Sequence, residues 1–189
     1  MARPATVSRE EVLDRLQKAF RACGYDATSL ADLAEATGLK KASLYHYFPG
    51  GKREMVLAVV DKVMQEFAAA VVREHEMPGS AEKRLDLFFQ VLLDYFGTGE
   101  ELCVIGNLAV SSELPGVAGA VASGFSAWTN VLVRCLREMG VPKEEARMRA
   151  LEAVALFQGS IVLTRGLNDP RIFRQLIKRM RVRLLSDVS

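Results

Sequence analysis

The chain has 189 residues, of which 50% are hydrophobic and 25% are charged. This composition supplies enough apolar material for a sizeable core and excludes an intrinsically disordered protein. The formal net charge of +2 excludes a polycation that binds nucleic acid through its overall charge. Residues 1–53, however, contain nine Lys or Arg against six Asp or Glu, whereas residues 54–189 contain sixteen against seventeen. A contact with phosphates is therefore expected in the N-terminal part.

The cysteines and histidines argue against a disulfide framework, a metal centre and a cofactor. The chain has three cysteines, Cys23, Cys103 and Cys135, which is an odd number, and they are far apart in the sequence. Neither of its two histidines, His46 and His75, has the spacing to a cysteine or a carboxylate that metal ligands require. We therefore expect no metal, no cofactor and a reducing compartment. Without an 18-residue apolar run or a signal peptide, the sequence predicts a cytoplasmic protein with no membrane partner.

Helical spacing of apolar residues continues along the whole chain, without strand alternation, and predicts an all-α protein of about nine helices. Ser8 with Glu11, and Ser29 with Asp32, have the spacing of capping boxes, and Gly38 is a typical helix end. The expected helices cover about 9–23, 30–37, 40–47, 52–74, 81–96, 103–111, 117–139, 143–165 and 170–184.

Two of these helices are short and are joined by a turn that contains Gly38. With the preceding helix as a brace, they have the layout of a helix-turn-helix over about 29–48. The second short helix combines two lysines, a serine, two tyrosines and a histidine, which suits phosphates and base edges in a major groove. Because Tyr and His are also common half-buried in protein cores, the spacing alone leaves both interpretations open.

Three segments make the sequence similar to the DNA-binding domain of the TetR family of transcriptional regulators. They are Gly-Tyr-Asp-Ala-Thr-Ser at 24–29, Leu33-Ala34, and Gly-Leu-Lys-Lys-Ala-Ser-Leu-Tyr-His-Tyr-Phe at 38–48. The resemblance implies a three-helix helix-turn-helix DNA-binding domain over 1–53 and a helical effector-binding and dimerisation domain over 54–189. The implied partners are double-stranded operator DNA, a second copy of the chain in a homodimer, and a small-molecule effector.

The resemblance also implies which residues contact DNA. Thr28 would start the first short helix and touch a phosphate, and Lys52 would neutralise another phosphate. Many relatives have Ser or Thr where this chain has Lys40, so the usual side-chain cap of the recognition helix is missing. The turn Pro-Gly-Gly-Lys at 49–52 resembles a subgroup of the family. The implied set is Thr28, Ser29, Lys40, Lys41, Ala42, Ser43, Tyr45, His46, Tyr47 and Lys52.

The C-terminal part contains aromatic residues at helical spacing that could line an effector pocket, although such a stripe is more often plain core. Polar residues among them, namely Asn107, Thr129 and Gln158, need hydrogen-bond partners if they are buried, and a ligand, the backbone or water could supply these. The candidate pocket residues are Phe67, Phe88, Phe89, Leu92, Phe96, Cys103, Asn107, Phe125, Trp128, Thr129, Phe157 and Gln158.

The last two helices carry the expected dimer surface. Small residues on one helix permit close approach, and apolar residues repeat every four positions on the other. The resemblance implies that this helix pair forms a four-helix bundle with its copy. The candidate interface residues are Ala150, Val154, Ile161, Ile172, Leu176 and Met180. The many arginines of the last helix are interpreted as a solvated face.

The resulting prediction is a TetR-type repressor that a small-molecule effector releases from a palindromic operator. One alternative is a thiol sensor: Cys103 stands near a helix start, where the dipole lowers a thiol's pKa. Glu100 and Glu101 would raise that pKa, however, and a free cysteine is more often a small core residue. A ligand-independent DNA-binding protein is a second alternative, and an enzyme is a third. The sequence has no metal cluster, phosphate loop or catalytic triad in evident order, so no enzymatic activity is expected.

Overall fold

The computed structural model describes residues 7–76, 80–111 and 116–186. Across these residues it contains nine α-helices and no β-strand, which confirms the predicted all-α class. The helices are α1 (Arg9–Cys23), α2 (Leu30–Thr37), α3 (Lys41–Tyr47), α4 (Gly51–Glu76), α5 (Ala81–Phe96), α6 (Val104–Ala109), α7 (Ala118–Glu138), α8 (Lys143–Leu167) and α9 (Arg171–Leu184).

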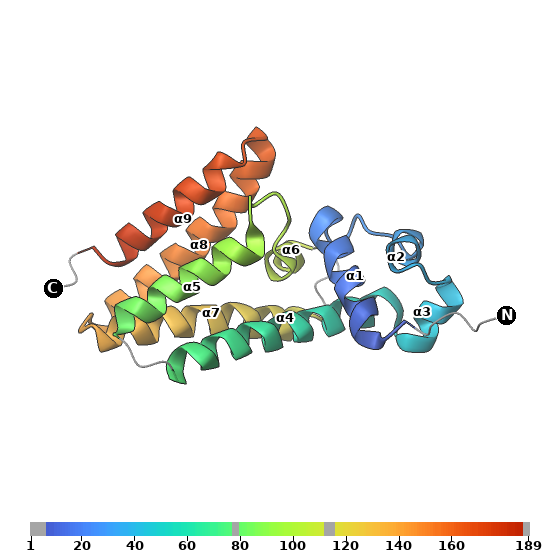
Figure 1. The fold of residues 1–189 in the computed structure, drawn as a ribbon, viewed down its shortest axis with the longest axis horizontal. Coiled ribbons are helices and arrows are strands. Elements are labelled where there is room, and N and C mark those ends of the chain that lie inside the picture. Colours follow the sequence, from blue (N-terminus) through green and yellow to red (C-terminus); the bar gives the residue numbers. More distant parts are fainter. Residues whose placement is uncertain (1–6, 77–79, 112–115, 187–189) are drawn as a thin grey trace.

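The helices form two units that α4 connects (Figure 1). Helices α1, α2 and α3 gather at one end, while α5, α7, α8 and α9 make the larger unit, and α6 lies between α5 and α1. The expected domain division after residue 53 falls inside α4. The first half of α4 buries Val56 and Val59 in contact with α1, whereas its second half runs beside α7. One continuous helix therefore belongs to both units.

Local side-chain caps explain where the short helices begin. Ser29 Oγ accepts the backbone N–H of Asp32, and the Asp32 carboxylate accepts the N–H of Ser29, so a complete capping box starts α2. Gly38 ends this helix in the left-handed conformation at φ 71°. At α1 only half of the expected box forms, because Ser8 accepts the N–H of Glu11 but the Glu11 carboxylate pairs with Arg15 instead.

The core is continuous across the two units. Phe20, Leu44 and Phe48 are almost completely buried in the small unit, where they fix α1, α3 and the turn after α3. In the larger unit, Phe157 of α8 and Phe173 of α9 lie edge to face with ring centroids 6.1 Å apart. Burial of apolar area on this scale is the main driving force of folding, and it holds α3 in a fixed orientation at the surface.

Candidate nucleic-acid interface and effector cavity

Helix α3 has one buried side and presents the rest of its surface to solvent. Leu44 is completely buried, whereas Lys41, Ala42, Tyr45 and His46 are exposed. The Tyr45 ring is 45% exposed, so the interpretation of this segment as a tyrosine-rich core helix is wrong for Tyr45 and His46. The exposed surface combines a cation, two polar rings and a small side chain on a short helix, a combination that can enter a major groove.

Two other residues of α3 are half-buried and contribute less surface. Ser43 lies at the edge of the exposed face. The hydroxyl of Tyr47 donates a hydrogen bond to the backbone carbonyl of Val7, 2.8 Å away. Tyr47 therefore fixes the chain that enters α1, and its polar atom is already occupied within the protein.

The lysines at the two ends of this region differ in their surroundings. Lys40 is exposed and occupies the cap position of α3, where no side chain caps the first backbone N–H groups. Lys52, in the first turn of α4, holds its ammonium nitrogen 4.2 Å from the centre of the Tyr25 ring. Such a cation–π contact positions the charge without neutralising it.

The structure corrects the role expected for Thr28. Its side chain is only 2% exposed, and its hydroxyl donates to the Gly24 carbonyl at 2.5 Å. Ser29, which is exposed, provides the cap of α2 instead. Thr28 thus stabilises the turn between α1 and α2 from the inside, and its hydroxyl is already bonded within the protein.

A hollow opens between α4, α5 and α7. Its volume is about 90 Å³, and the walls are Val63, Glu66, Phe67, Val91, Leu92, Tyr95, Phe96 and Trp128. Four of the predicted pocket residues, Phe67, Leu92, Phe96 and Trp128, therefore share one cavity. Sequence reasoning did not include Glu66, Val91 and Tyr95 among the pocket residues, because they lie beside the apolar stripes of their helices rather than on them.

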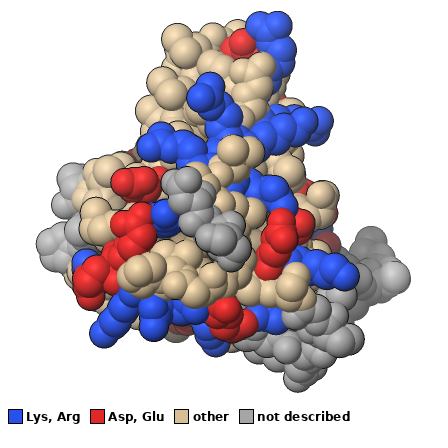
Figure 2. Space-filling model, turned by 90° about the vertical axis from the view of Figure 1, so that its left-hand side faces the viewer, with Lys and Arg blue, Asp and Glu red and all other residues tan. Residues whose placement is uncertain are grey.

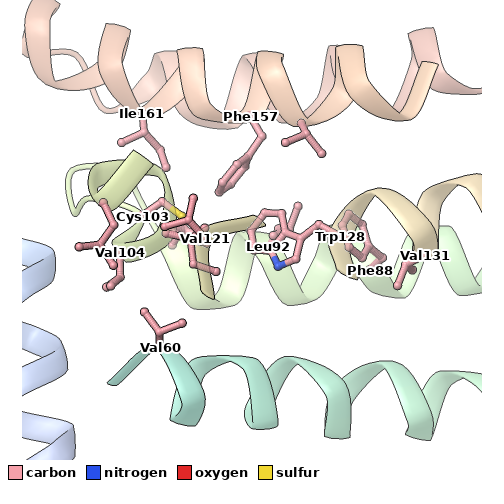
Figure 3. Close-up of a cluster of buried hydrophobic side chains, with 14 of the residues drawn as sticks. Val60, Phe88, Leu92, Cys103, Val104, Val121, Trp128, Val131, Phe157 and Ile161 are labelled. Atoms are coloured by element: carbon pink, nitrogen blue, oxygen red, sulfur yellow. The ribbon is translucent and has the colours of Figure 1, made fainter. Parts of the chain in front are cut away.

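The other aromatic candidates fill the core around this cavity (Figure 3). The rings of Phe88 and Trp128 lie edge to face with their centroids 6.3 Å apart, and the centroid of the Phe157 ring lies 4.9 Å from that of Trp128. Phe89 is buried against Phe88, and Phe125 is half-buried. None of these four phenylalanines lines the hollow, so their expected place in a pocket wall is corrected to core packing.

The polar candidates are satisfied by the protein itself. The Thr129 hydroxyl donates to the Phe125 carbonyl at 2.8 Å, as is common on helices. Gln158 reaches across to Cys103 at the start of α6 and hydrogen-bonds its thiol. Asn107 Oδ1 accepts the backbone N–H of Tyr25 at 2.7 Å. Asn107 thus joins α6 to the unit formed by α1, α2 and α3 instead of facing the cavity.

A second set of contacts joins the end of α1 to the end of α5. The guanidinium of Arg21 is buried, lies 4.2 Å from the centre of the Tyr95 ring and donates to the Tyr95 carbonyl at 3.0 Å. Its charge is balanced by Glu101 at 2.8 Å. The Gln17 side chain donates to the Tyr95 hydroxyl at 2.6 Å. Tyr95 therefore contacts α1 directly while it forms a wall of the cavity.

Comparison with known proteins agrees with this geometry. The family model "Bacterial regulatory proteins, tetR family" matches residues 12–59, and the model "Transcriptional regulator LmrA/YxaF-like, C-terminal domain" matches residues 84–179. The HTH-type transcriptional regulator YxaF of Bacillus subtilis is 30% identical over 167 residues, which are 83% of this chain and 84% of that protein. The chain belongs to the TetR family.

Further relatives fit this assignment. The HTH-type transcriptional repressor ComR of Escherichia coli is 37% identical over 113 residues, covering 60% of this chain and 48% of ComR. The crystal structure of a TetR transcriptional regulator from Legionella pneumophila superposes with a TM-score of 0.80 at 21% identity, over 94% of this chain and 97% of that one. This structural likeness shows the shared fold. TetR-family regulators bind operator DNA and form dimers, with effector ligands in the C-terminal domain.

Cys103 of this TetR-family chain stands at a helix start, as expected from the sequence, and it is buried. Cys103 caps α6 with its sulfur, which accepts the Gly106 N–H at 3.5 Å, and it is 6% exposed. Burial raises the pKa of the Cys103 thiol, and the hydrogen bonds from Gln158 and Gly106 only partly oppose this effect. Cys23, the last residue of α1, is exposed.

The expected dimer residues are also corrected in part. Ala150, Val154, Ile161 and Met180 are at most 8% exposed, because they pack between helices of the same chain. Ile172 and Leu176 are half-buried. The outer face of α8 and α9 instead exposes large apolar side chains, a stripe that we call the α8–α9 outer face. These side chains belong to Met148, Leu151, Val162, Leu163, Leu167 and Val182.

The arginines of α9 are partly paired with acids. Arg171 pairs with Asp169 at 2.8 Å, and Arg181 pairs with Glu82 and Asp86 of α5. Figure 2 views the end of the molecule away from α3 and shows basic and acidic side chains interspersed on it. The presence of both signs of charge agrees with a solvated face.

Proposed function

We propose that this TetR-family regulator is a repressor that binds a palindromic operator as a homodimer and leaves it when a small molecule binds. The observation that carries the proposal is the surface of α3, where a fully buried Leu44 anchors a helix that exposes Lys41, Ala42, Tyr45 and His46. Repression is supported by ComR, which is itself named a transcriptional repressor. A transcriptional regulator acts on chromosomal DNA, so the proposed location is the cytoplasm and no catalytic role is assigned.

The α3 surface divides into base-reading and phosphate-binding residues. Lys41, Ala42, Ser43, Tyr45 and His46 are assigned to the groove, since their side chains lie on or beside the exposed face. A second set consists of polar side chains that lie beside α3 and are exposed or partly exposed, and these are assigned to phosphates. These residues are Ser29, Lys40 and Lys52. Thr28 and Tyr47 have no assigned DNA contact.

Dimerisation is assigned to the α8–α9 outer face. Large apolar side chains that are exposed together on two neighbouring helices mark an interaction surface, and a two-fold axis beside α8 would give a self-complementary interface. Helix α8 has the length and hydropathy that could cross a membrane. Its inner face, however, packs Ala150 and Phe157 inside the protein, so a dimer contact accounts better for the outer face. Two copies place two α3 helices on one side of the DNA.

The test is selection of bound duplexes from a random pool, followed by affinity measurements with variants. An inverted repeat with half-sites about one helical turn apart is expected. Lys52→Ala should weaken binding to selected and random DNA alike and lower the salt slope by about one. Lys83→Ala, which removes the same charge from α5, is the matched control. A pool without an inverted repeat, or equal effects of the two variants, would contradict the proposal.

A further inference from the structure

The ammonium group of Lys52 rests against the face of a buried aromatic ring. Its nitrogen lies 4.2 Å from the centre of the Tyr25 ring, and Tyr25 is only 5% exposed. Tyr25 belongs to the turn between α1 and α2, whereas Lys52 lies in the first turn of α4. The contact therefore joins the segment that precedes the helix-turn-helix to the segment that follows it.

The Tyr25 residue is held in place through its backbone and through its ring. Its backbone N–H donates to Asn107 Oδ1 at 2.7 Å, and its carbonyl accepts the N–H of Thr28 at 3.2 Å. The ring packs in a tilted geometry on that of Phe20, with the two centroids 6.0 Å apart, and Phe20 is 1% exposed. A residue with these contacts has little freedom to rotate, so its ring presents a fixed face to the ammonium.

Lys52 differs from Lys62, another lysine of α4, in what holds its charge. The Lys62 ammonium lies 3.0 Å from the Asp14 carboxylate and also pairs with Glu66, so two anions already neutralise it. Within the described part of the chain, Lys52 forms no ion pair. A neutral ring attracts a cation and leaves its charge undiminished. Because Lys52 is also half-exposed, this charge remains available to an anion outside the protein.

A lysine that is already positioned binds a phosphate at a smaller entropic cost than a freely rotating one. The long side chain loses rotamer freedom when it is immobilised, and this loss opposes binding. Contact with the Tyr25 ring imposes part of that order before DNA arrives. The ammonium has three N–H groups, and a ring on one side of it leaves the others free to donate to a phosphate oxygen.

We infer that Tyr25 is a positioning residue for DNA binding, because its ring holds the Lys52 ammonium ready for a phosphate of the operator. This inference rests on the proposed function, in which Lys52 contacts a phosphate. A ring that only fills the core would act through its volume. A ring that positions a cation acts through the electron density of its face as well, and this difference can be measured.

A double-mutant cycle separates positioning from packing. Tyr25→Leu replaces the ring by an apolar side chain and should weaken binding to the selected operator roughly fivefold. In a Lys52→Ala background the same change should alter the affinity by less than about twofold, because no ammonium is left to position. Tyr25→Phe keeps a ring and should recover most of the affinity that Tyr25→Leu loses. Phe20→Leu is the matched control: it removes a ring from the same core, and its effect should be equal in both backgrounds.

A second measurement keeps the volume of the ring nearly constant. Trifluorophenylalanine, incorporated in place of Tyr25, resembles phenylalanine in shape, but its fluorine atoms withdraw electrons from the ring face and weaken the attraction to a cation. Compared with Tyr25→Phe, this side chain should weaken operator binding roughly threefold. It should have no effect on the affinity of the Lys52→Ala protein. Urea unfolding checks that every variant is folded under the conditions of the binding assay.

Two results would overturn the inference. One is an equal loss of affinity from Tyr25→Leu in the two backgrounds, and the other is an affinity that the fluorinated ring leaves unchanged or raises. These results differ from a failure of the proposed function. If Lys52→Ala weakens operator binding but the cycle is additive, only the role of Tyr25 is lost. If the random pool yields no operator, the proposed function itself is lost.

Discussion

At the scale of single residues, the environment of each cysteine sets its reactivity. The thiolate is the reactive form, and burial raises the pKa of both Cys103 and Cys135. Fewer thiolates are therefore present at neutral pH at these two sites. Cys23, by contrast, is exposed and therefore accessible to a reagent in solution.

We expect an alkylating reagent at about pH 7.5 to modify Cys23 at least tenfold faster than Cys103, with the rate at Cys103 increasing as the pH rises through its elevated pKa. Peptide mapping by mass spectrometry after timed quenching measures both rates, and Cys23→Ser should abolish the fast phase. If Cys103 reacted as fast as Cys23, the interpretation of this chain as a thiol sensor would regain support.

Asp32 gives the helix-turn-helix a defined pH dependence. Hydrogen bonds from the Ser29 hydroxyl and backbone N–H hold the pKa of the Asp32 carboxyl below its usual value of 3.8. Because the pKa of Asp32 is lower in the folded protein than in the unfolded chain, the ionised carboxylate stabilises the fold at any pH above the ordinary pKa of 3.8. This stabilisation is lost as the pH falls through the lowered pKa of the folded state. Urea unfolding should show Asp32→Asn less stable than the parent at about pH 6, with a smaller difference at about pH 3. An equal loss of stability at both pH values would exclude a role of the ionised capping box.

At the scale of helices, some features were predictable because their causes are local. The capping box of α2 and the left-handed Gly38 involve residues at most four positions apart from their partners, so the short sequence pattern contains the whole interaction. The burial of Leu44 follows in the same way from helical periodicity, whereas periodicity left open whether Tyr45 is exposed.

Contacts between distant segments were not predictable in this way. The bond from Tyr25 to Asn107 and that from Gln17 to Tyr95 join residues about eighty positions apart. Their spacing in the chain has no period that a pattern could reveal. Ala150 and Val154 illustrate a further limit: small residues indicate close helix packing, but not whether the neighbouring helix belongs to the same chain.

The joint between α1 and α6 leads to a prediction at this scale. Asn107→Leu keeps the approximate volume of the side chain but leaves the Tyr25 N–H without the Asn107 oxygen at 2.7 Å. We expect the free energy of unfolding to fall by about 1–2 kcal/mol, measured by urea denaturation. Asn130→Leu on α7 is the control, because Asn130 is exposed and should change stability little. Equal losses in the two variants would show that the joint contributes nothing.

At the scale of the whole molecule, the surfaces proposed for DNA recognition and for dimerisation lie at separate places. Helix α3 projects at one end, and α8 and α9 lie together on an outer side of the larger unit (Figure 1). A palindromic operator requires two α3 helices at a fixed separation. The affinity for such DNA therefore depends on a contact that is distant from the DNA itself.

Val162 is the residue of choice for testing this dependence. Its side chain lies on the α8–α9 outer face and is 66% exposed, so a change there leaves the core of the chain intact. Val162→Glu would place two carboxylates near each other across the two-fold axis and bury them without partners. This penalty should raise the dimer dissociation constant by roughly two orders of magnitude, as measured by sedimentation. Affinity for the selected inverted repeat should fall as the dimer dissociates, while affinity for a single half-site stays the same.

Val110→Glu is the matched control, because Val110 is 82% exposed at the end of α6, away from this face. A Val162→Glu protein that remains dimeric and binds the repeat like the parent would place the dimer contact on another surface.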